Sequence, residues 1–253
     1  MDLDIRGKAA VVGGGSQGIG FAIARTLARE GAEVAIVARH ADALKTAAEA
    51  IRADSGVRVV EVAADIRKAE DCARIIDTAV RELGALDILV NNDGAPPLGT
   101  LDSFDDEAWR KAVEQNLMSV VRLTRAAIPH MKARGGGRIV NVTSLSTLQP
   151  APTFGLSVAT WAGVIGYAKT LSLEVASHGI TVNTVCPGRI ATERLAKVFG
   201  DTSAEELARD IPVGRIGTPD EIAGLVAFLA SSLGGYITGA TLHVDGGRRA
   251  SLL

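Results

Sequence analysis

Short apolar, β-like runs alternate with longer segments of helical character along the whole chain. Because these runs are apolar throughout rather than alternating with polar residues, we expect strands buried on both faces of a parallel sheet. With right-handed crossovers, this order predicts an α/β fold: a Rossmann-type, doubly wound parallel sheet of about seven strands with helices on both faces. The expected strands are Ala9–Val12, Glu33–Val37, Val57–Ala63, Asp87–Val90, Arg138–Val142, Thr181–Val185 and Thr241–Val244.

No linker, repeat or low-complexity tract interrupts this order, so residues 1–253 are expected to form a single domain. A chain of 253 residues with 47% hydrophobic composition can bury one large core. Its net charge of −2 provides no basic field for a nucleic acid or a membrane. Cys72 and Cys186 lack ligand-like spacing, so we expect buried thiols, no metal and, without a signal peptide or a long apolar span, a cytoplasmic protein.

A glycine-rich turn follows the first apolar run and precedes an amphipathic stretch that continues through Glu30. It reads Gly13-Gly14-Gly15-Ser16-Gln17-Gly18-Ile19-Gly20. Glycines at 14, 18 and 20 let the backbone turn tightly, let a pyrophosphate approach the helix N-terminus and let the helix pack closely on the strand. The spacing G-x-x-x-G-x-G differs from the common fingerprint, and glycine alone is a weak signal. Its place between a strand and a helix nevertheless favours a dinucleotide site over an ordinary turn.

Seven landmarks, spread over nearly the whole chain, occur in the order found in the short-chain dehydrogenase/reductase family. They are the glycine turn, Asp65, Asn91-Asn92-Asp93-Gly94, Asn116, Ser144, Pro187-Gly188 and the closing Ile237-Thr238-Gly239 with Val244-Asp245-Gly246-Gly247. The chain resembles this family, and within it most resembles the β-ketoacyl-carrier-protein reductase-like members. The resemblance implies an oxidoreductase that binds a nicotinamide cofactor and acts on a carbonyl or alcohol group of a small molecule.

The resemblance also assigns the cofactor contacts. They are Gly14, Ser16, Gln17, Gly18, Ile19, Gly20, Ala38, Arg39, Asp65, Ile66, Asn91, Gly94, Pro187, Gly188, Ile190 and Thr192. Asp65 is expected to accept a hydrogen bond from the adenine amino group. Ala38 and Arg39 stand where an acid would bind both ribose hydroxyls, which favours NADP(H) over NAD(H). Gln17 argues against this choice, because many NADP(H)-using relatives have a second basic residue there, and Arg39 is alternatively a solvated surface charge.

The family's catalytic residues are an asparagine, a serine and a Tyr-x-x-x-Lys pair on one helix. The resemblance assigns the first two roles to Asn116 and Ser144. The tyrosine should follow the serine by thirteen residues, but Ser157 stands there, and Trp161 stands in the lysine position. A serine hydroxyl is a poor general acid at neutral pH, and tryptophan carries no cation. The chain therefore resembles an oxidoreductase whose acid–base pair is missing.

Two charged residues in loops at the strand ends could replace the lost pair. Asp93 stands where the family usually has a small apolar residue, and a carboxyl pressed near cofactor phosphates could have a raised pKa and act as an acid. Arg189 could grip a substrate carboxylate or polarise a carbonyl. A turn-capping Asp93 and a solvated Arg189 are the alternatives. Tyr167 lies about 280° of helical rotation from Ser157, so it points to another face of the helix.

Two functions of different class stay open from the sequence. The first is an NADP(H)-dependent oxidoreductase with an atypical site, and the second is a cofactor-binding protein without turnover that acts as a sensor or scaffold. Small residues on the predicted long helices around Asp105–Arg134 and Phe154–His178 favour a homodimer or homotetramer. The polar stretch from Gly200 to Asp210 is interpreted as a mobile lid or, alternatively, as an ordinary surface helix.

Overall fold

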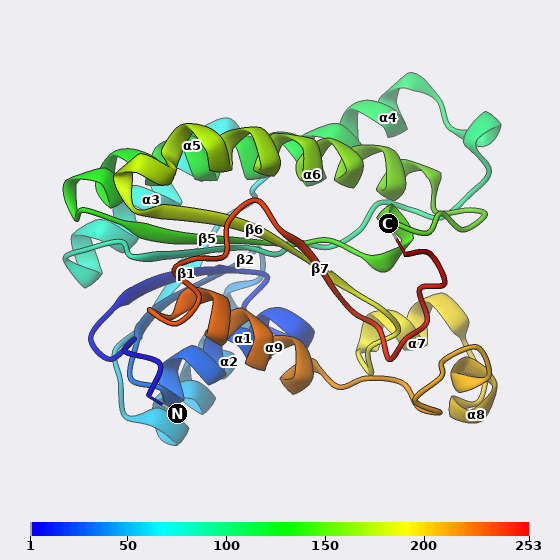
Figure 1. Ribbon diagram of the computed structural model, residues 1–253, viewed down its shortest axis with the longest axis horizontal. Helices are drawn as coiled ribbons and strands as arrows, with labels where there is room; N and C mark the ends of the chain where they lie inside the picture. The colour runs from blue at the N-terminus through cyan, green and yellow to red at the C-terminus, as the bar shows by residue number, and fades with distance from the viewer. Residues whose placement is uncertain (1, 253) are drawn as a thin grey trace.

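A parallel sheet of seven strands runs through the computed structural model, which describes residues 2–252 (Figure 1). The strands are β1 (Ala9–Gly13), β2 (Glu33–Ala38), β3 (Val59–Ala63), β4 (Ile88–Asn91), β5 (Gly137–Val142), β6 (Ile180–Pro187) and β7 (Thr241–Val244). Their order in the sheet is β3-β2-β1-β4-β5-β6-β7, and every neighbouring pair is parallel. The predicted doubly wound fold is confirmed, because the order reverses direction between β1 and β4.

Two layers of helices cover the sheet, one on each face (Figure 1). The lower layer in this view consists of α1 (Gly18–Arg29), α2 (Ala41–Ser55) and α9 (Pro219–Ala230). The upper layer is built from α3 (Ala69–Leu83), α5 (Ser119–Ala133) and α6 (Gly155–Val175). Buried aliphatic side chains form a separate core between the sheet and each layer. This arrangement explains why the inner strands are apolar on both faces.

The two edge strands differ from that expectation. All residues of β1, β4 and β6 are buried, but Glu61 in β3 and His243 in β7 are exposed. An edge strand has a neighbour on one side only, so water reaches some of its side chains. The expectation of complete burial is therefore wrong for β3 and β7. It holds for β1, β4 and β6, whereas β2 and β5 each have at least one partly buried residue. Cys72 and Cys186 are both buried and free, as expected.

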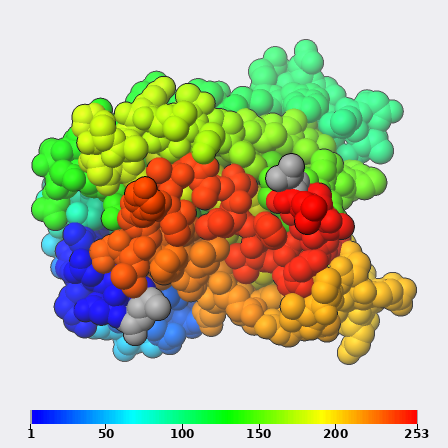
Figure 2. All heavy atoms as spheres, viewed as in Figure 1, coloured from blue at the N-terminus to red at the C-terminus, as the bar shows by residue number. Residues whose placement is uncertain are grey.

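Shorter elements gather at the end of the molecule where the strands terminate (Figure 1). They are η1 (Leu101–Ser103), α4 (Asp106–Val113), the π-helical turn η2 (Glu114–Met118), η3 (Leu145–Thr147), α7 (Glu193–Phe199) and α8 (Ala204–Ala208). One further short helix, η4 (Ala176–His178), lies elsewhere, between the end of α6 and the start of β6. The space-filling view shows α7 and α8, in yellow and gold, beside the red C-terminal segment (Figure 2). The polar stretch 200–210 thus contains the short helix α8. Within residues 2–252, every helix is too short or too polar to cross a membrane.

Candidate functional site

The glycine turn brings the end of β1, the start of α1 and the loop after β4 into close contact. The register of β1 against β4 pairs Val12 with Val90, so both loops leave the sheet side by side. A Cβ added at Gly20 would lie 2.2 Å from the carbonyl oxygen of Gly14. Gly14 and Gly18 have φ angles of +60° and +57°, which favour glycine. The glycines therefore serve the tight turn and the close packing that the sequence predicts.

The N-terminus of α1 is free to receive an anion. Its N-cap residue, Gln17, has an extended backbone, and its side chain makes no capping hydrogen bond. Backbone N–H groups in the first turn of a helix have no partner within the helix, and the helix dipole adds positive charge there. Thr192 lies beside the turn, because a Cβ at Gly18 would contact its methyl group at 3.5 Å. A glycine-lined helix N-terminus of this kind fits the pyrophosphate of a dinucleotide.

A cleft of about 430 Å³ opens beside this turn, at the carboxyl ends of the strands. It brings together ten residues that the sequence analysis singled out: Ile19, Asp93, Ser144, Ser157, Trp161, Pro187, Gly188, Arg189, Ile190 and Thr192. A smaller, enclosed cavity of about 20 Å³ shares some of its walls and contains Ile66, Asn91 and Asn116. The other expected cofactor contacts line neither space: Gly14, Ser16, Gln17, Gly18, Gly20, Ala38, Arg39, Asp65 and Gly94.

Ser144 and Ser157 line the cleft from two different elements. Ser144 follows β5, and its Oγ accepts hydrogen bonds from the Ser146 backbone N–H at 3.2 Å and the Ser146 hydroxyl at 3.0 Å. Because both bonds use Ser144 Oγ as an acceptor, its own proton is left to donate. Ser157 lies in the first turn of α6 and is 1% exposed, and its Oγ has no partner within residues 2–252.

Trp161 lies one helical turn after Ser157, in the position that the resemblance assigns to a lysine. Its side chain is buried and packs against Val120 and Val164. It lines both the cleft and the enclosed cavity, so the wall between them is aromatic and apolar. Tyr167 packs at the edge of the same cluster and does not line the cleft, and burial raises the pKa of its phenol further. It therefore provides no replacement acid.

Asn116 sits in the π-helical turn η2, where α4 joins α5. Its Nδ2 donates to Thr160 Oγ at 2.8 Å, while its Oδ1 has no partner within residues 2–252. A single π turn re-aims side chains and often marks a functional site. Thr160 is a residue that the sequence analysis missed. It lies on α6 between Ser157 and Trp161, and only the packing of α6 against η2 reveals its contact with Asn116.

Several polar atoms around the enclosed cavity lack partners within the described part of the chain. Three are acceptors, namely Asn91 Oδ1, Asp93 Oδ2 and Asn116 Oδ1, and one is a donor, Asn141 Nδ2. A cavity of about 20 Å³ has room for one water molecule. Buried polar groups without partners are costly, so this cavity favours a water molecule or a protonated carboxyl that can donate to the acceptors.

Asp93 lines both the cleft and this enclosed cavity. Its Oδ1 accepts a hydrogen bond from the Gly94 backbone N–H at 2.6 Å, which is the turn-capping role considered for it. Burial raises the pKa of the Asp93 carboxyl to about 7, although the Gly94 N–H and the charges of Arg39 and Arg67 oppose the shift. Asp93 can therefore be protonated near neutral pH at a point that faces the cleft.

Arg189 is held by the segment that follows α7. Its guanidinium is paired with Asp210 and donates to the Leu207 carbonyl oxygen, and Asp210 also pairs with Arg248 at 2.8 Å. The side chain of Arg189 is 18% exposed and lies over the Phe199 ring. The interpretation as a solvated arginine is therefore wrong. A substrate role for Arg189 stays a prediction, and it requires the substrate to compete with Asp210.

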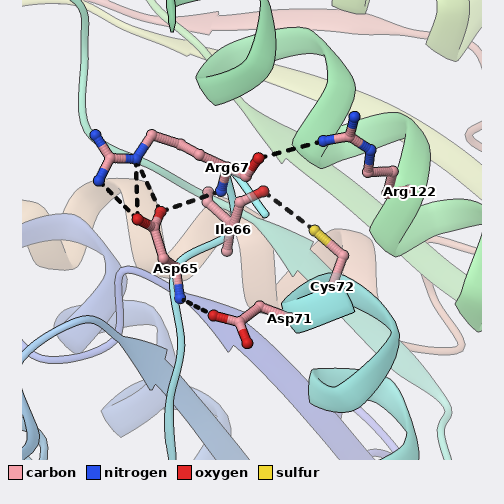
Figure 3. Close-up of polar contacts among 6 residues, drawn as sticks. All are labelled: Asp65, Ile66, Arg67, Asp71, Cys72 and Arg122. Carbon is pink, nitrogen blue, oxygen red and sulfur yellow. Dashed lines mark hydrogen bonds and ion pairs between the residues drawn. The ribbon is translucent and has the colours of Figure 1, made fainter. Parts of the chain in front are cut away.

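The end of β3 carries a second arginine that the sequence analysis missed (Figure 3). Arg67 forks onto the Asp65 carboxylate through Nε at 2.8 and 3.1 Å and Nη2 at 2.6 Å, and its backbone N–H donates to Asp65 Oδ1 at 3.1 Å. This side-chain pairing holds the pKa of Asp65 below its usual range. Both carboxylate oxygens are occupied, so the adenine contact of Asp65 stays a prediction. Aspartate two residues before an arginine is a local turn signal that could have indicated the pair.

Comparisons with known proteins agree with this geometry. A family model described as enoyl-(acyl carrier protein) reductase matches residues 14–249. The 3-oxoacyl-[acyl-carrier-protein] reductase FabG of Vibrio cholerae is 40% identical over 246 residues, which cover 97% of this chain and 98% of the relative. Human dehydrogenase/reductase SDR family member 4 is 36% identical over 97% of this chain and 88% of its own.

Solved structures match equally well. L-sorbose reductase from Gluconobacter frateurii, in complex with NADPH and L-sorbose, shares 37% identity with a TM-score of 0.94, covering 100% of both chains. A 7α-hydroxysteroid dehydrogenase in complex with NADH and 7-oxo glycochenodeoxycholic acid shares 28% identity with a TM-score of 0.94, covering 100% of this chain and 98% of its own.

The fold and the glycine turn beside the cleft define a dinucleotide-binding protein of the Rossmann class. The match over residues 14–249 and the relatives above 30% identity show the family: the chain belongs to the short-chain dehydrogenases/reductases. The relatives are named as reductases and dehydrogenases, which places this chain among the NAD(P)-dependent oxidoreductases.

Substituting Asp93 by asparagine should change stability in a pH-dependent way. The pKa of Asp93 in the folded state, about 7, lies above that of an unfolded aspartate, about 3.9. Ionised Asp93 therefore destabilises the folded state above pH 7, and this cost disappears below about pH 4. We expect Asp93→Asn to raise the free energy of unfolding at pH 8 by up to about 4 kcal/mol and to change it little at pH 4.

Urea unfolding of both proteins across this pH range measures the effect. Asp65→Asn serves as the matched control and should destabilise the protein at pH 8, because the pKa of Asp65 is lowered rather than raised. An equal gain from Asp93→Asn at pH 4 and pH 8 would show that ionisation of the carboxyl is not the cause.

Proposed function

We propose that this chain is an NADP(H)-dependent oxidoreductase that acts on a carbonyl or alcohol group of a small molecule through an atypical active site. The observation that carries the proposal is the composition of one cleft. It combines residues beside the dinucleotide turn, Ile19 and Thr192, with a free hydroxyl proton at Ser144 and a protonatable carboxyl at Asp93. The NADPH complex of L-sorbose reductase supports the same cofactor and substrate chemistry, whereas the NADH complex of the hydroxysteroid dehydrogenase shows that the fold also accepts NAD(H).

The bound nicotinamide cofactor would supply hydride to the carbonyl carbon, and the protein must supply a proton to the carbonyl oxygen. Ser144 can donate a hydrogen bond to that oxygen, since its two contacts with Ser146 use only its lone pairs. Such a donor stabilises the negative charge that develops on the oxygen. The carboxyl of Asp93 can then release its proton to the oxygen and regain one from solvent through the open cleft. Its pKa of about 7 suits general acid catalysis near neutral pH.

Binding of the cofactor without turnover is the second candidate function. Two features favour it: Ser157, which the resemblance assigns to the tyrosine position, is buried, and Trp161, which it assigns to the lysine position, is a buried apolar ring. Stopped-flow measurement of nicotinamide absorbance against a panel of ketones and aldehydes separates the two. Loss of NADPH absorbance that slows in Asp93→Asn supports the oxidoreductase. Tight NADPH binding with no absorbance change against any carbonyl supports the sensor or scaffold.

Rebuilding the missing pair should increase the rate of carbonyl reduction. Ser157→Tyr together with Trp161→Lys places a phenol and an ammonium one turn apart beside Ser144, and the ammonium lowers the phenol pKa. General acid catalysis typically contributes about 10²- to 10⁴-fold, so we expect the double variant to reduce activated ketones with NADPH appreciably faster than the parent. Each single variant should gain much less.

Stopped-flow rates of the parent, both single variants and the double variant test this. Loss of the Trp161 ring leaves a cavity that costs stability, so folding and NADPH binding are measured first. A folded, NADPH-binding double variant that is no faster than the parent would show that these positions do not form the floor of the active site.

Arg39 should contribute selectively to NADPH binding. It is exposed directly after β2, which ends in Ala38 and not in an acid that could bind the ribose hydroxyls. A charge-assisted phosphate contact contributes roughly 1.5–3 kcal/mol, so Arg39→Ala should weaken NADPH by about tenfold or more and NADH little. Titration by nicotinamide fluorescence measures both affinities. Equal affinity of the native protein for NADPH and NADH would contradict the proposed preference.

The proposal includes a homodimer or homotetramer. On α6, Ala162 is exposed and Leu173 is 74% exposed, and Ala126 on α5 is partly buried. Close packing of such helices against a second copy would bury them. Sedimentation equilibrium at micromolar concentration should give a mass of two or four chains. A single species near 26 kDa would refute this assembly.

A further inference from the structure

Two arginines and two carboxylates meet where β2, β3 and β4 end. Arg39 follows β2, Asp65 and Arg67 follow β3, and Asp93 follows β4. Electrostatic interactions connect them, because Arg39 and Arg67 both favour the ionised forms of Asp65 and Asp93. The carboxyl ends of these strands are the edge of the sheet on which a dinucleotide lies, next to the glycine turn. We call these four residues the charge quartet. Their net charge affects whether an anionic group of a cofactor can bind beside them.

The position of Arg67 is fixed from several sides (Figure 3). Its guanidinium forks onto Asp65, and its carbonyl oxygen accepts from Arg122 at 3.4 Å. The backbone of Asp65 is held in turn, because its N–H donates to Asp71 Oδ2 at 2.7 Å. Asp71 is itself paired with Arg74 at 2.7 Å. Arg67 therefore has a defined place at the strand end, although its side chain is 41% exposed.

The charges of the quartet show what Arg67 contributes. Without Arg67, the carboxylate of Asp65 would cancel the single cation of Arg39, and any ionised fraction of Asp93 would add a charge that repels a phosphate dianion. With Arg67 in place, two cations face the carboxylate of Asp65, and Arg39 is left to attract an anion. Like charges brought together in a partly buried site oppose binding, and opposite charges favour it.

We propose that Arg67 is a second determinant of NADP(H) preference, which neutralises Asp65 so that Arg39 can hold the 2′-phosphate of the cofactor. Arg67 acts through Asp65 and Arg39 and is in this sense a positioning residue. The proposal explains how a preference for a 2′-phosphate can exist although Gln17, in the glycine turn, carries no charge. It deepens the proposed function, because it rests on the cofactor site but not on hydride transfer.

Calorimetric titration with two adenosine ligands tests the proposal without turnover. Adenosine 2′,5′-bisphosphate and adenosine 5′-monophosphate differ only in the 2′-phosphate. Arg67→Met keeps the apolar stem of the side chain and removes its charge. We expect this variant to bind the bisphosphate about five- to tenfold more weakly and the monophosphate within about twofold of the native protein. The preference of the native protein for the bisphosphate should fall as salt is added.

Arg81→Met is the matched control, because it removes an exposed arginine near the C-terminal end of α3 that pairs with Glu82, outside the quartet. It should leave both affinities unchanged. A double variant, Asp65→Asn with Arg67→Met, removes both charges of the pair. If Arg67 acts by neutralising Asp65, this double variant should recover most of the native affinity for the bisphosphate.

Three results would overturn the proposal. Equal weakening of both ligands by Arg67→Met would assign Arg67 a structural or adenine-binding role. No recovery in the folded double variant would show that Arg67 contacts the phosphate itself instead of acting through Asp65. No effect of Arg67→Met on either ligand would remove Arg67 from the site. The proposed function is tested by a different result. It fails if the native protein prefers the bisphosphate but transfers no hydride to any carbonyl.

Discussion

The close approach of the glycine turn to the loop after β4 is the constraint on which the site depends. Asn92 donates a hydrogen bond from Nδ2 to the Gly13 carbonyl oxygen at 3.0 Å, and a Cβ at Gly13 would lie 2.6 Å from the Asn92 carbonyl oxygen. No larger residue fits at this contact without moving one backbone. Because Asp93 follows Asn92 directly, the same contact places its carboxyl between the cleft and the enclosed cavity.

This placement concentrates energetic cost in one region of the protein. The acceptors Asn91 Oδ1, Asp93 Oδ2 and Asn116 Oδ1 and the hydroxyl of Ser157 are buried without partners within residues 2–252. By contrast, the two cores above and below the sheet consist of buried hydrophobic side chains. The stability gained in those cores offsets the free-energy cost of the unsatisfied groups. Unsatisfied buried polar groups are typical of sites that handle protons or ligands. The local cost therefore agrees with a functional cleft.

Patterns with a fixed period in the sequence predicted the fold well. The strand positions, the glycine turn and the convergence of Ser144, Ser157 and Trp161 on one cleft follow from chain order and parallel strands, because successive strand ends share one edge of the sheet. Contacts between segments distant in the chain could not be predicted this way. The bond between Asn116 and Thr160 and the pairing of Arg189 with Asp210 depend on how elements approach in space.

Other features were hidden for more local reasons. A π-helical turn around Asn116 interrupts a helix without changing the apolar pattern, so periodicity does not reveal it. The exposure of Glu61 in β3 follows from the position of that strand at the edge of the sheet, which chain order alone does not give. The fork between Asp65 and Arg67 is different, because it lies within three residues and carries a turn signal that the sequence does contain.

The two ends of the site are electrostatically coupled through Asp93. Arg39 and Arg67 favour its ionised form and so oppose the rise in its pKa that burial causes. A phosphate dianion beside Arg39 would neutralise the charge of Arg39. Arg39 would then lower the pKa of Asp93 less, and this pKa would rise further. Cofactor binding at the adenosine end would then favour the protonated carboxyl at the catalytic end. In the proposed atypical site, this coupling would place a proton on Asp93 when the hydride donor is bound.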